Sequence, residues 1–165
     1  MFRIKYSREI LLKLFYLVDV MDPKDITPDR IIDDNSPFYP GVNRKERVFI
    51  KQLLDKVIYD REEIDKLISE NLVGWKLERL LPVDRALLRL GVAESFINDQ
   101  KAVIIDDIIR IAKKYGTEDS YKIINAILDK VIKSTSPRPK KPKPPQKGPT
   151  AKPSGKKTPP KKVTK

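Results

Sequence analysis

Residues 111–131 have the sequence IAKKYGTEDSYKIINAILDKV, and this stretch decides the fold class of the chain. Apolar residues recur every three or four positions on both sides of a short polar segment, which predicts two helices joined by a turn. Gly116 stands where the first helix needs a left-handed C-terminal cap, and Thr117 can cap the second. Asp119 then falls in the first turn of the second helix, where the helix dipole favours an acid. The sequence therefore predicts a helical hairpin here.

The same periodicity extends outward through most of the chain, and no stretch alternates like a β-strand. Ser7 is a plausible N-cap for a first helix that Pro23 ends. Asp60 followed by Glu63 resembles a capping box, and Pro82 suits the first turn of a helix. The sequence therefore predicts an all-α bundle of about seven helices. The expected helices cover residues 7–21, 29–33, 45–58, 60–71, 82–97, 103–115 and 117–133.

The positive charge is concentrated in a C-terminal segment. The formal net charge is +12, but residues 134–165 hold eleven Lys and Arg, no acid and nine of the fourteen prolines. Residues 1–133 keep 24 Lys and Arg against 23 Asp and Glu, so they are nearly neutral. We therefore expect a helical domain over 1–133 and a disordered tail, with local polyproline-II character, over 134–165. The tail is either a solubilising segment without a specific partner or an electrostatic attractant for RNA phosphates.

Missing residue types exclude several kinds of chemistry. The chain has no Cys and no His, which removes disulfides, thiol nucleophiles, imidazole bases and the usual zinc ligands. Asp106 and Asp107 are adjacent on a predicted helix and point about 100° apart, so they make a poor catalytic dyad. The glycines are scattered and none follows a strand, so no phosphate-binding loop is expected. We expect no enzyme, no cofactor and no metal.

The sequence also gives no sign of a membrane association. The N-terminus, MFRIKYSREI, lacks the uninterrupted apolar stretch of a signal peptide. No run approaches the roughly 18 apolar residues of a membrane-spanning helix. A cytoplasmic location is compatible with both observations.

Three segments carry a family pattern in a fixed order. The first is 111–131, where an alanine–lysine–aromatic–glycine run is followed by acids and serine and then by a helix with asparagine, leucine and aspartate. The second is WKLERLLPVDRALLRLGVAE at 75–94, and the third is Arg8–Glu9 with Tyr16 two turns later. Together they cover essentially all of residues 3–133, and they resemble the NusB family of bacterial transcription antitermination factors. The other matching residues are Trp75, Arg79, Leu80, Arg85, Leu88, Arg89, Leu90, Glu94, Ala112, Lys113, Tyr115, Gly116, Thr117, Glu118, Asp119, Ser120, Asn125, Leu128 and Asp129.

The resemblance implies a fold of two three-helix subdomains and a role in transcription. It implies binding of boxA-type single-stranded RNA together with NusE, a ribosomal protein, in an RNA polymerase elongation complex, including at ribosomal RNA operons. NusB-like domains also occur fused to ribosomal RNA cytosine methyltransferases, so a detached RNA-targeting domain of an RNA modification system is an alternative. A module that binds protein alone is a third, and a homodimer is left open because some family members dimerise.

At the N-terminus, the cations Arg3, Lys5 and Arg8 are candidates for phosphate contacts, with Tyr6 available to a base. Cations and stacking surfaces commonly hold single-stranded RNA. The other interpretation is a solvated helix start. Because cations at a helix N-terminus oppose its dipole, an external anion would relieve that conflict. Together with the resemblance, this favours RNA.

A second set of candidates surrounds the turn of 111–131. The resemblance points to Asp119 and Ser120 as base contacts, although both also suit a purely structural role in the first helical turn. The flanking residues Lys113, Tyr115 and Lys122 are further RNA candidates.

This chain departs from the family pattern at three positions in the same region. Asp106–Asp107 replaces Asn-Glu, Ile123 replaces an aromatic, and Ala126 replaces a glycine. If the usual aromatic stacks on RNA, the ring that substitutes for it here would be Tyr121 or Tyr115.

The resemblance places Tyr16 and Asp84 at the contact with NusE. A half-buried core tyrosine and an ordinary first-turn acid are the alternatives for these two residues. Trp75 is predicted to be a packing residue at the junction between the subdomains. The series Arg79, Arg85 and Arg89 is predicted to be structural, with Glu78 and Asp84 near enough to pair with it.

Overall fold

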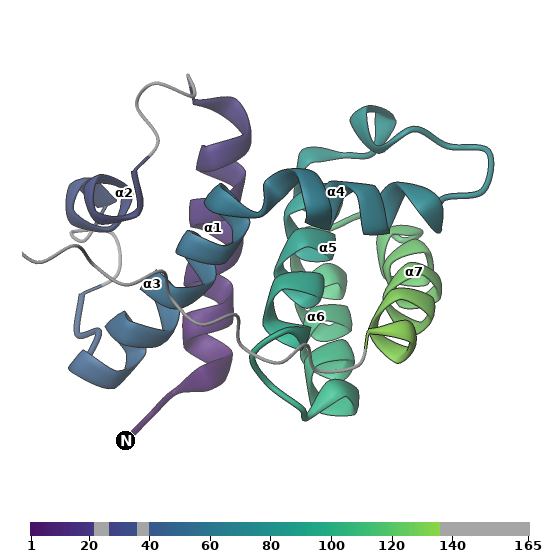
Figure 1. Cartoon of the computed structure of the whole chain (residues 1–165). Coiled ribbons are helices and arrows are strands. Elements are labelled where there is room, and N and C mark those ends of the chain that lie inside the picture. The colour runs from purple at the N-terminus through teal and green to yellow at the C-terminus, as the bar shows by residue number, and fades with distance from the viewer. Residues whose placement is uncertain (22–26, 36–39, 136–165) are drawn as a thin grey trace, which may run out of the picture.

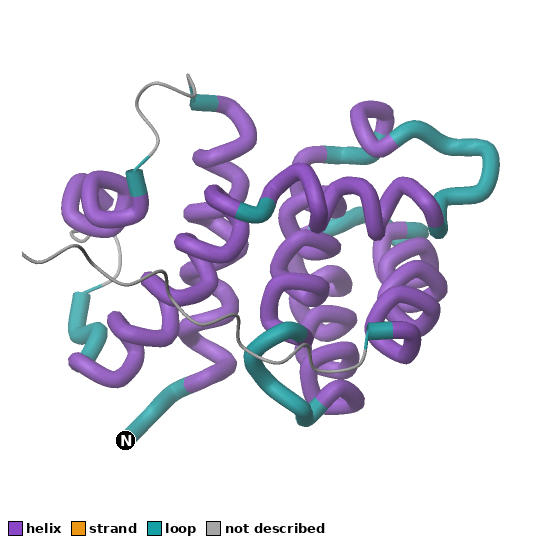
Figure 2. Tube along the Cα trace, viewed as in Figure 1, coloured by secondary structure: helices purple, strands orange, loops and turns teal. Residues whose placement is uncertain are grey.

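The computed structural model describes residues 1–21, 27–35 and 40–135 (Figure 1). Within these residues every regular element is a helix and none is a strand (Figure 2), so the all-α prediction is confirmed. The elements are α1 (Ile4–Val20), α2 (Pro28–Asn35), α3 (Arg44–Tyr59), α4 (Arg61–Glu70), the 3-10 helix η3 (Leu77–Arg79), α5 (Pro82–Ser95), α6 (Lys101–Tyr115) and α7 (Ser120–Ser134).

The helices form two groups that share one core. Helices α1, α2 and α3 pack together, and α4 to α7 form the second group (Figure 1). Helix α5 contacts α1, α3, α4, α6 and α7, and eleven of its fourteen residues are buried. Gly91 lets α7 approach it closely, because a Cβ atom there would lie 2.8 Å from the side chain of Leu128. Helix α5 is therefore the central element of the fold.

Two helix starts differ from the prediction. Helix α1 begins at Ile4, so Ser7 is not an N-cap but a buried residue of the first turn, and its hydroxyl donates to the carbonyl oxygen of Arg3 at 3.1 Å. Asp60 makes no side-chain cap for α4. The capping box lies instead at the start of α3, where Asn43 accepts from the backbone N–H of Glu46 and Glu46 accepts from that of Asn43, both at 3.0 Å. The prediction of Pro82 in the first turn of a helix is confirmed, since α5 begins at this residue.

Gly116 serves a different purpose from the predicted one. Its φ is −90°, so it is not a left-handed cap. A Cβ atom there would lie 2.6 Å from the Cβ of Ser120 and 2.7 Å from the carbonyl oxygen of Ala112. Glycine is needed at this position because Ser120 and the backbone of Ala112 pack directly against it. Helix α7 begins at Ser120, three residues after Thr117, so Thr117 is not its N-cap as predicted.

The remaining predictions about the fold concern Trp75, the C-terminal tail and membrane-spanning helices. Trp75 is 62% exposed, so the prediction that it packs at the subdomain junction is wrong. The predicted tail lies outside the described residues from 136 onward, while α7 continues to Ser134. Among the described residues, no helix has both the length and the apolar character needed to cross a membrane.

Candidate RNA and partner interface

Arg8 lies in the core and not on the predicted RNA surface. Its side chain is fully buried, and its guanidinium donates to Glu94 at 2.8 and 2.5 Å and also to Asp107. Burial lowers the pKa of Arg8, but the two carboxylates raise it and prevail. The network joins α1 to α5 and α6. This corrects the expectation of a phosphate contact, because the charge of Arg8 is already balanced inside the protein.

Arg3 is held against the start of α3. Its guanidinium donates to both carboxylate oxygens of Glu46, at 2.8 and 2.9 Å, and lies 4.6 Å from the centre of the Tyr6 ring. The hydrogen bond from the Arg3 side chain, helped by backbone N–H groups and opposed by burial, lowers the pKa of Glu46 to about 2. The side chain of Asn43 also donates to the carbonyl oxygen of Met1 at 2.9 Å. The N-terminal residues are thus fastened to α3, and much of the Arg3 charge is balanced.

Lys5 is the cation of this cluster whose side chain stays exposed and unpaired among the described residues, so its phosphate contact stays a prediction. It is exposed, and no carboxylate of the described residues lies within 4.0 Å of its ammonium group. Tyr6 beside it is half-buried under Arg3. The free positive charge at the start of α1 is therefore that of Lys5.

Glu9 connects α1 to the C-terminal end of α6. It accepts hydrogen bonds from Lys114 at 2.9 Å, from the hydroxyl of Tyr115 at 3.0 Å and from Arg110 at 3.3 Å. Burial raises the pKa of Glu9, but the hydrogen bonds from these three donors together outweigh burial, so the pKa of Glu9 is lowered. The ring of Tyr115 stays 38% exposed, with the Lys114 ammonium 5.0 Å from its centre. The structure thus brings the second turn of α1 to the predicted RNA residue Tyr115.

A second basic and aromatic cluster lies where α6 ends and α7 begins. The ring of Tyr121 has the ammonium of Lys113 4.9 Å from its centre and that of Lys122 5.8 Å from it. Lys122 also lies 3.4 Å from Asp119, whose side chain is 78% exposed. Asp119 occupies the N-cap position of α7 but makes no cap hydrogen bond with its side chain. Its carboxylate is therefore available to a ligand.

Ser120 has a structural role in the same turn. It is fully buried, and its hydroxyl oxygen accepts from the backbone N–H of Thr117 at 2.9 Å. This corrects the expectation that Ser120 contacts a base directly. It holds the turn that presents Asp119.

The two residues predicted to meet NusE lie in different environments. Tyr16 is 41% exposed on α1 and is available to a partner. Asp84 is only 3% exposed, and its Oδ1 atom has no hydrogen-bond partner among the described residues. Burial raises the pKa of Asp84, and the neighbouring Ser120 hydroxyl opposes that rise. The structure therefore offers Tyr16, but not Asp84, for direct contact, which corrects the second expectation.

Arg85 and Arg89 of α5 are structural, as predicted, but their partners differ from the predicted ones. Arg79 of η3 was also predicted to be structural, yet its side chain is exposed and makes no ion pair with a described residue. Arg85 donates to Asp19 at 2.5 and 3.1 Å, and Arg89 donates to Asp19 at 2.7 Å and to both oxygens of Asp65. Arg61 of α4 also donates to Asp19, at 3.1 Å. One carboxylate of α1 thus binds three arginines of the second helix group, which no local spacing could indicate.

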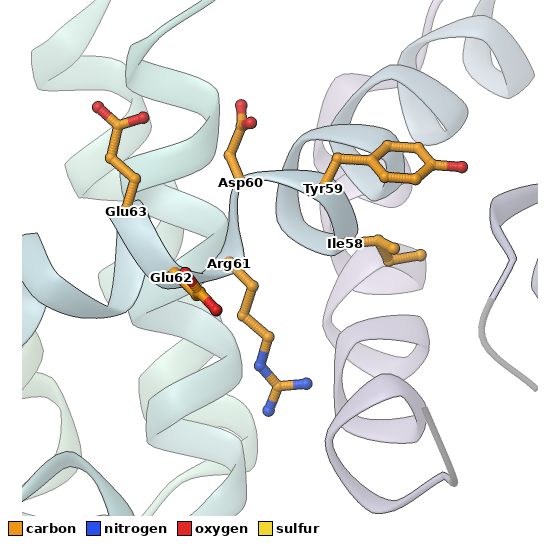
Figure 3. Close-up of a pocket in the computed structure, with 6 residues that line it drawn as sticks. All are labelled: Ile58, Tyr59, Asp60, Arg61, Glu62 and Glu63. Carbon is orange, nitrogen blue, oxygen red and sulfur yellow. The ribbon is translucent and has the colours of Figure 1, made fainter. Parts of the chain in front are cut away.

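A cavity of about 470 Å³ lies at the junction of α3 and α4. Figure 3 shows the carboxylates of Asp60 and Glu63 pointing to one side and Arg61 to the other. Its lining residues are Ile58, Tyr59, Asp60, Arg61, Glu62 and Glu63. Three of the six lining residues are acids, which repel phosphate, and none of the predicted RNA residues lines the cavity, so this cavity is not the RNA site.

Comparison with known proteins decides the family. The sequence profile of the NusB family matches residues 5–133. The chain belongs to the NusB family. A transcription antitermination protein NusB from a Nitratiruptor species is 34% identical over 130 residues, which covers 77% of this chain and 89% of that protein.

Solved NusB structures have the same fold. A NusB structure from T. maritima superposes with a TM-score of 0.70 at 30% identity, covering 82% of this chain and 94% of that one. A chain in a crystal structure of the antitermination factors NusB and NusE in complex with dsRNA superposes with the same score at 27% identity, covering 79% and 96%. The NusB family role is thus in transcription antitermination, and a solved relative assembles with NusE and RNA.

Several residues of this NusB surface were missed by sequence reasoning. Glu9 accepts hydrogen bonds from Lys114 and Tyr115 of α6, which lie about a hundred residues away in the sequence. Tyr121 was considered only as a substitute ring, yet it has the ammonium groups of two lysines within 6 Å of its centre. A lysine at each of positions 113 and 122 was the available signal, but only the folded hairpin shows that both reach the same ring.

Proposed function

We propose that this chain is an antitermination adaptor that binds boxA-type single-stranded RNA together with NusE in the RNA polymerase elongation complex. Ribosomal RNA operons would be among its sites of action, and the cytoplasm its location. The observation that carries this proposal is the Lys113–Tyr121–Lys122 cluster beside the exposed carboxylate of Asp119. Cations next to an aromatic ring, here the partly exposed ring of Tyr121, are the usual means of holding unstacked bases and their phosphates.

The cluster supports a division of labour between its side chains. Lys113, Lys122 and Lys5 would contact phosphates, which position RNA without selecting its sequence. Tyr121 and Tyr115 would offer ring faces to bases. The Asp119 carboxylate repels phosphate in general but can accept hydrogen bonds from base amino groups, so it would supply the selectivity.

The partner contact would use the exposed face of α1 around Tyr16. Tyrosine is enriched at the centres of protein interfaces, and this one is 41% exposed. Asp84 would act on this surface only indirectly, through the packing of the α5 and α7 starts. We propose in addition that the basic residues from 136 to 165 attract RNA without regard to sequence.

The test is a titration of the full chain with boxA-like and scrambled RNA of equal length, with and without NusE. The proposal expects tighter binding of the boxA-like RNA and a further gain with NusE. Lys122→Ala should weaken both RNAs, whereas Lys130→Ala, an exposed lysine on the same helix away from the cluster, should not.

Asp119→Asn tests base selection directly, because it keeps the shape of the side chain and removes its charge. Loss of repulsion alone would tighten all RNAs modestly, and more so at low salt. A change in the ratio of boxA-like to scrambled affinity at two salt concentrations supports base contact. An unaltered ratio at both would place base selection elsewhere, and binding to NusE with no RNA dependence would contradict the whole proposal.

A further inference from the structure

Trp75 is an exposed indole that the proposed site does not use. It is the one tryptophan of the chain, and it lies in the segment that joins α4 to α5. Its exposed fraction is 62%, and Val73 and Leu81 in the same segment are exposed by 83% and 47%. A large aromatic side chain that stays in water next to two other exposed apolar side chains suggests a ligand that covers it.

The loop that carries Trp75 is anchored at several points. Gly74 has φ +74°, a conformation that favours glycine and fixes the reversal just before the indole. After it, the side chains of Leu77 and Leu80 are buried, with exposed fractions of 5% and 6%. Arg85 donates to the carbonyl oxygens of Glu78 and Leu80 at 3.1 and 2.6 Å. Trp75 is therefore presented by a fixed loop.

Two cations accompany the ring. Lys76 follows it directly and Arg79 ends η3, and both are exposed. No carboxylate of the described residues lies within 4.0 Å of either cationic group, although Glu78 is exposed between them. A stacking surface with unneutralised cations matches the chemistry of a single-stranded nucleic acid better than that of an apolar protein surface.

The loop lies at the same end of the bundle as the Lys113–Tyr121–Lys122 cluster. Leu81 immediately precedes α5, and Asp84 in the first turn of α5 faces the hydroxyl of Ser120 at the start of α7. Helix α4, which leads into the loop, also contacts α7. Figure 1 shows the connection from α4 to α5 at the end of the bundle where α7 begins. RNA leaving the cluster can therefore continue toward this loop.

We propose that Trp75 stacks on a base of single-stranded RNA next to the segment held by the Lys113–Tyr121–Lys122 cluster, and that Lys76 and Arg79 contact its phosphates. The inference rests on the proposed function, because it extends the same RNA path. It adds a second aromatic contact, so the site spans more nucleotides than the cluster alone can hold.

The single tryptophan makes the test direct. Trp75 emission of the full chain is recorded while boxA-like RNA is added, in a short form and in forms extended at either end. RNA binding is followed in parallel by the anisotropy of labelled RNA. The proposal expects quenching by an extended RNA at saturation, with less or none by the short form, because stacked bases quench an indole.

Variants separate stacking from general effects. Trp75→Ala should weaken the extended RNA by about 5- to 150-fold and leave the short form unchanged, and Trp75→Phe should retain part of the gain. Lys76→Ala should reduce the salt dependence of the extended RNA. Tyr59→Ala is the matched control, since Tyr59 is 73% exposed but lies at the end of α3, and it should bind both RNAs as the wild type does.

Three results would overturn the inference, each in a different way. If extended RNA binds the wild type at saturation without quenching and Trp75→Ala binds equally well, the loop is not on the RNA path while the proposed function stands. If emission changes only when NusE is added and Trp75→Ala weakens only that binding, the loop is a protein-docking surface. If no RNA binds the wild type, the proposed function fails and this inference fails with it.

Discussion

Replacing Arg8 by alanine distinguishes a core cation from an RNA contact. The guanidinium of Arg8 is fully buried between Glu94 and Asp107. Its loss leaves two buried carboxylates without their cation, and removing one partner of a buried ion pair costs about 3–5 kcal/mol. Because small domains have only about 5–15 kcal/mol in total, Arg8→Ala should lose a large part of its stability. Urea unfolding followed by circular dichroism measures this as a lower midpoint with an unchanged slope.

Lys5→Ala is the matched control one turn earlier on the same helix. Lys5 is exposed and unpaired within the described residues, so its loss should change stability by less than about 0.5 kcal/mol while weakening both boxA-like and scrambled RNA. The triple variant with Arg8→Met, Glu94→Gln and Asp107→Asn should recover much of the stability, because no buried charge is left unpaired. If Arg8→Ala is as stable as the wild type and loses RNA affinity, the assignment of Arg8 to the core is refuted.

Three further perturbations test other parts of the molecule. Deleting residues 136–165 should flatten the slope of log K against log salt by about 0.7 for each phosphate that the tail neutralises, and an unchanged slope would show that the tail does not touch RNA. Tyr16→Asp should reduce NusE affinity by about 1–3 kcal/mol in calorimetry and leave RNA binding by the isolated protein intact; normal NusE binding by the folded variant would remove Tyr16 from the interface. Glu46→Gln should lower stability at neutral pH by about 1–2 kcal/mol, since the Glu46 pKa is lowered from 4.5 to about 2 by a partly exposed partner. That stability is present above pH 4.5 and lost as pH falls toward 2, so the wild type should approach the variant over this range, and parallel curves would contradict the assignment.

The sequence alone determined the fold class and the family. Helical spacing of apolar residues depends on neighbours within one or two turns, so it is visible in any window of the chain, and α6 and α7 were predicted closely. The helix start at Pro82 and the absence of strands among the described residues follow from equally local chemistry. The separation of charge between residues 1–133 and 134–165 is likewise a property of composition.

Only the tertiary structure decided which charged side chains are free to bind. Arg8 and Lys5 look alike in the sequence, yet one is buried beside Glu94 and Asp107 and the other remains in water. Ion pairs between residues about a hundred positions apart depend on how α1 docks on α5 and α6, and no local pattern records that docking.

The same reason explains the outcomes at Trp75, Asp84 and Tyr121. Trp75 was predicted to pack at the junction between the subdomains, but it is exposed in the segment that joins α4 to α5. The family resemblance placed Asp84 at a partner contact, but Asp84 is buried beside Ser120 at the start of α7. Tyr121 gains its lysine neighbours only when the hairpin closes. Local periodicity determines which segments are helices, whereas the exposure and the charge partners of each side chain depend on the packing of helices that are distant in the chain.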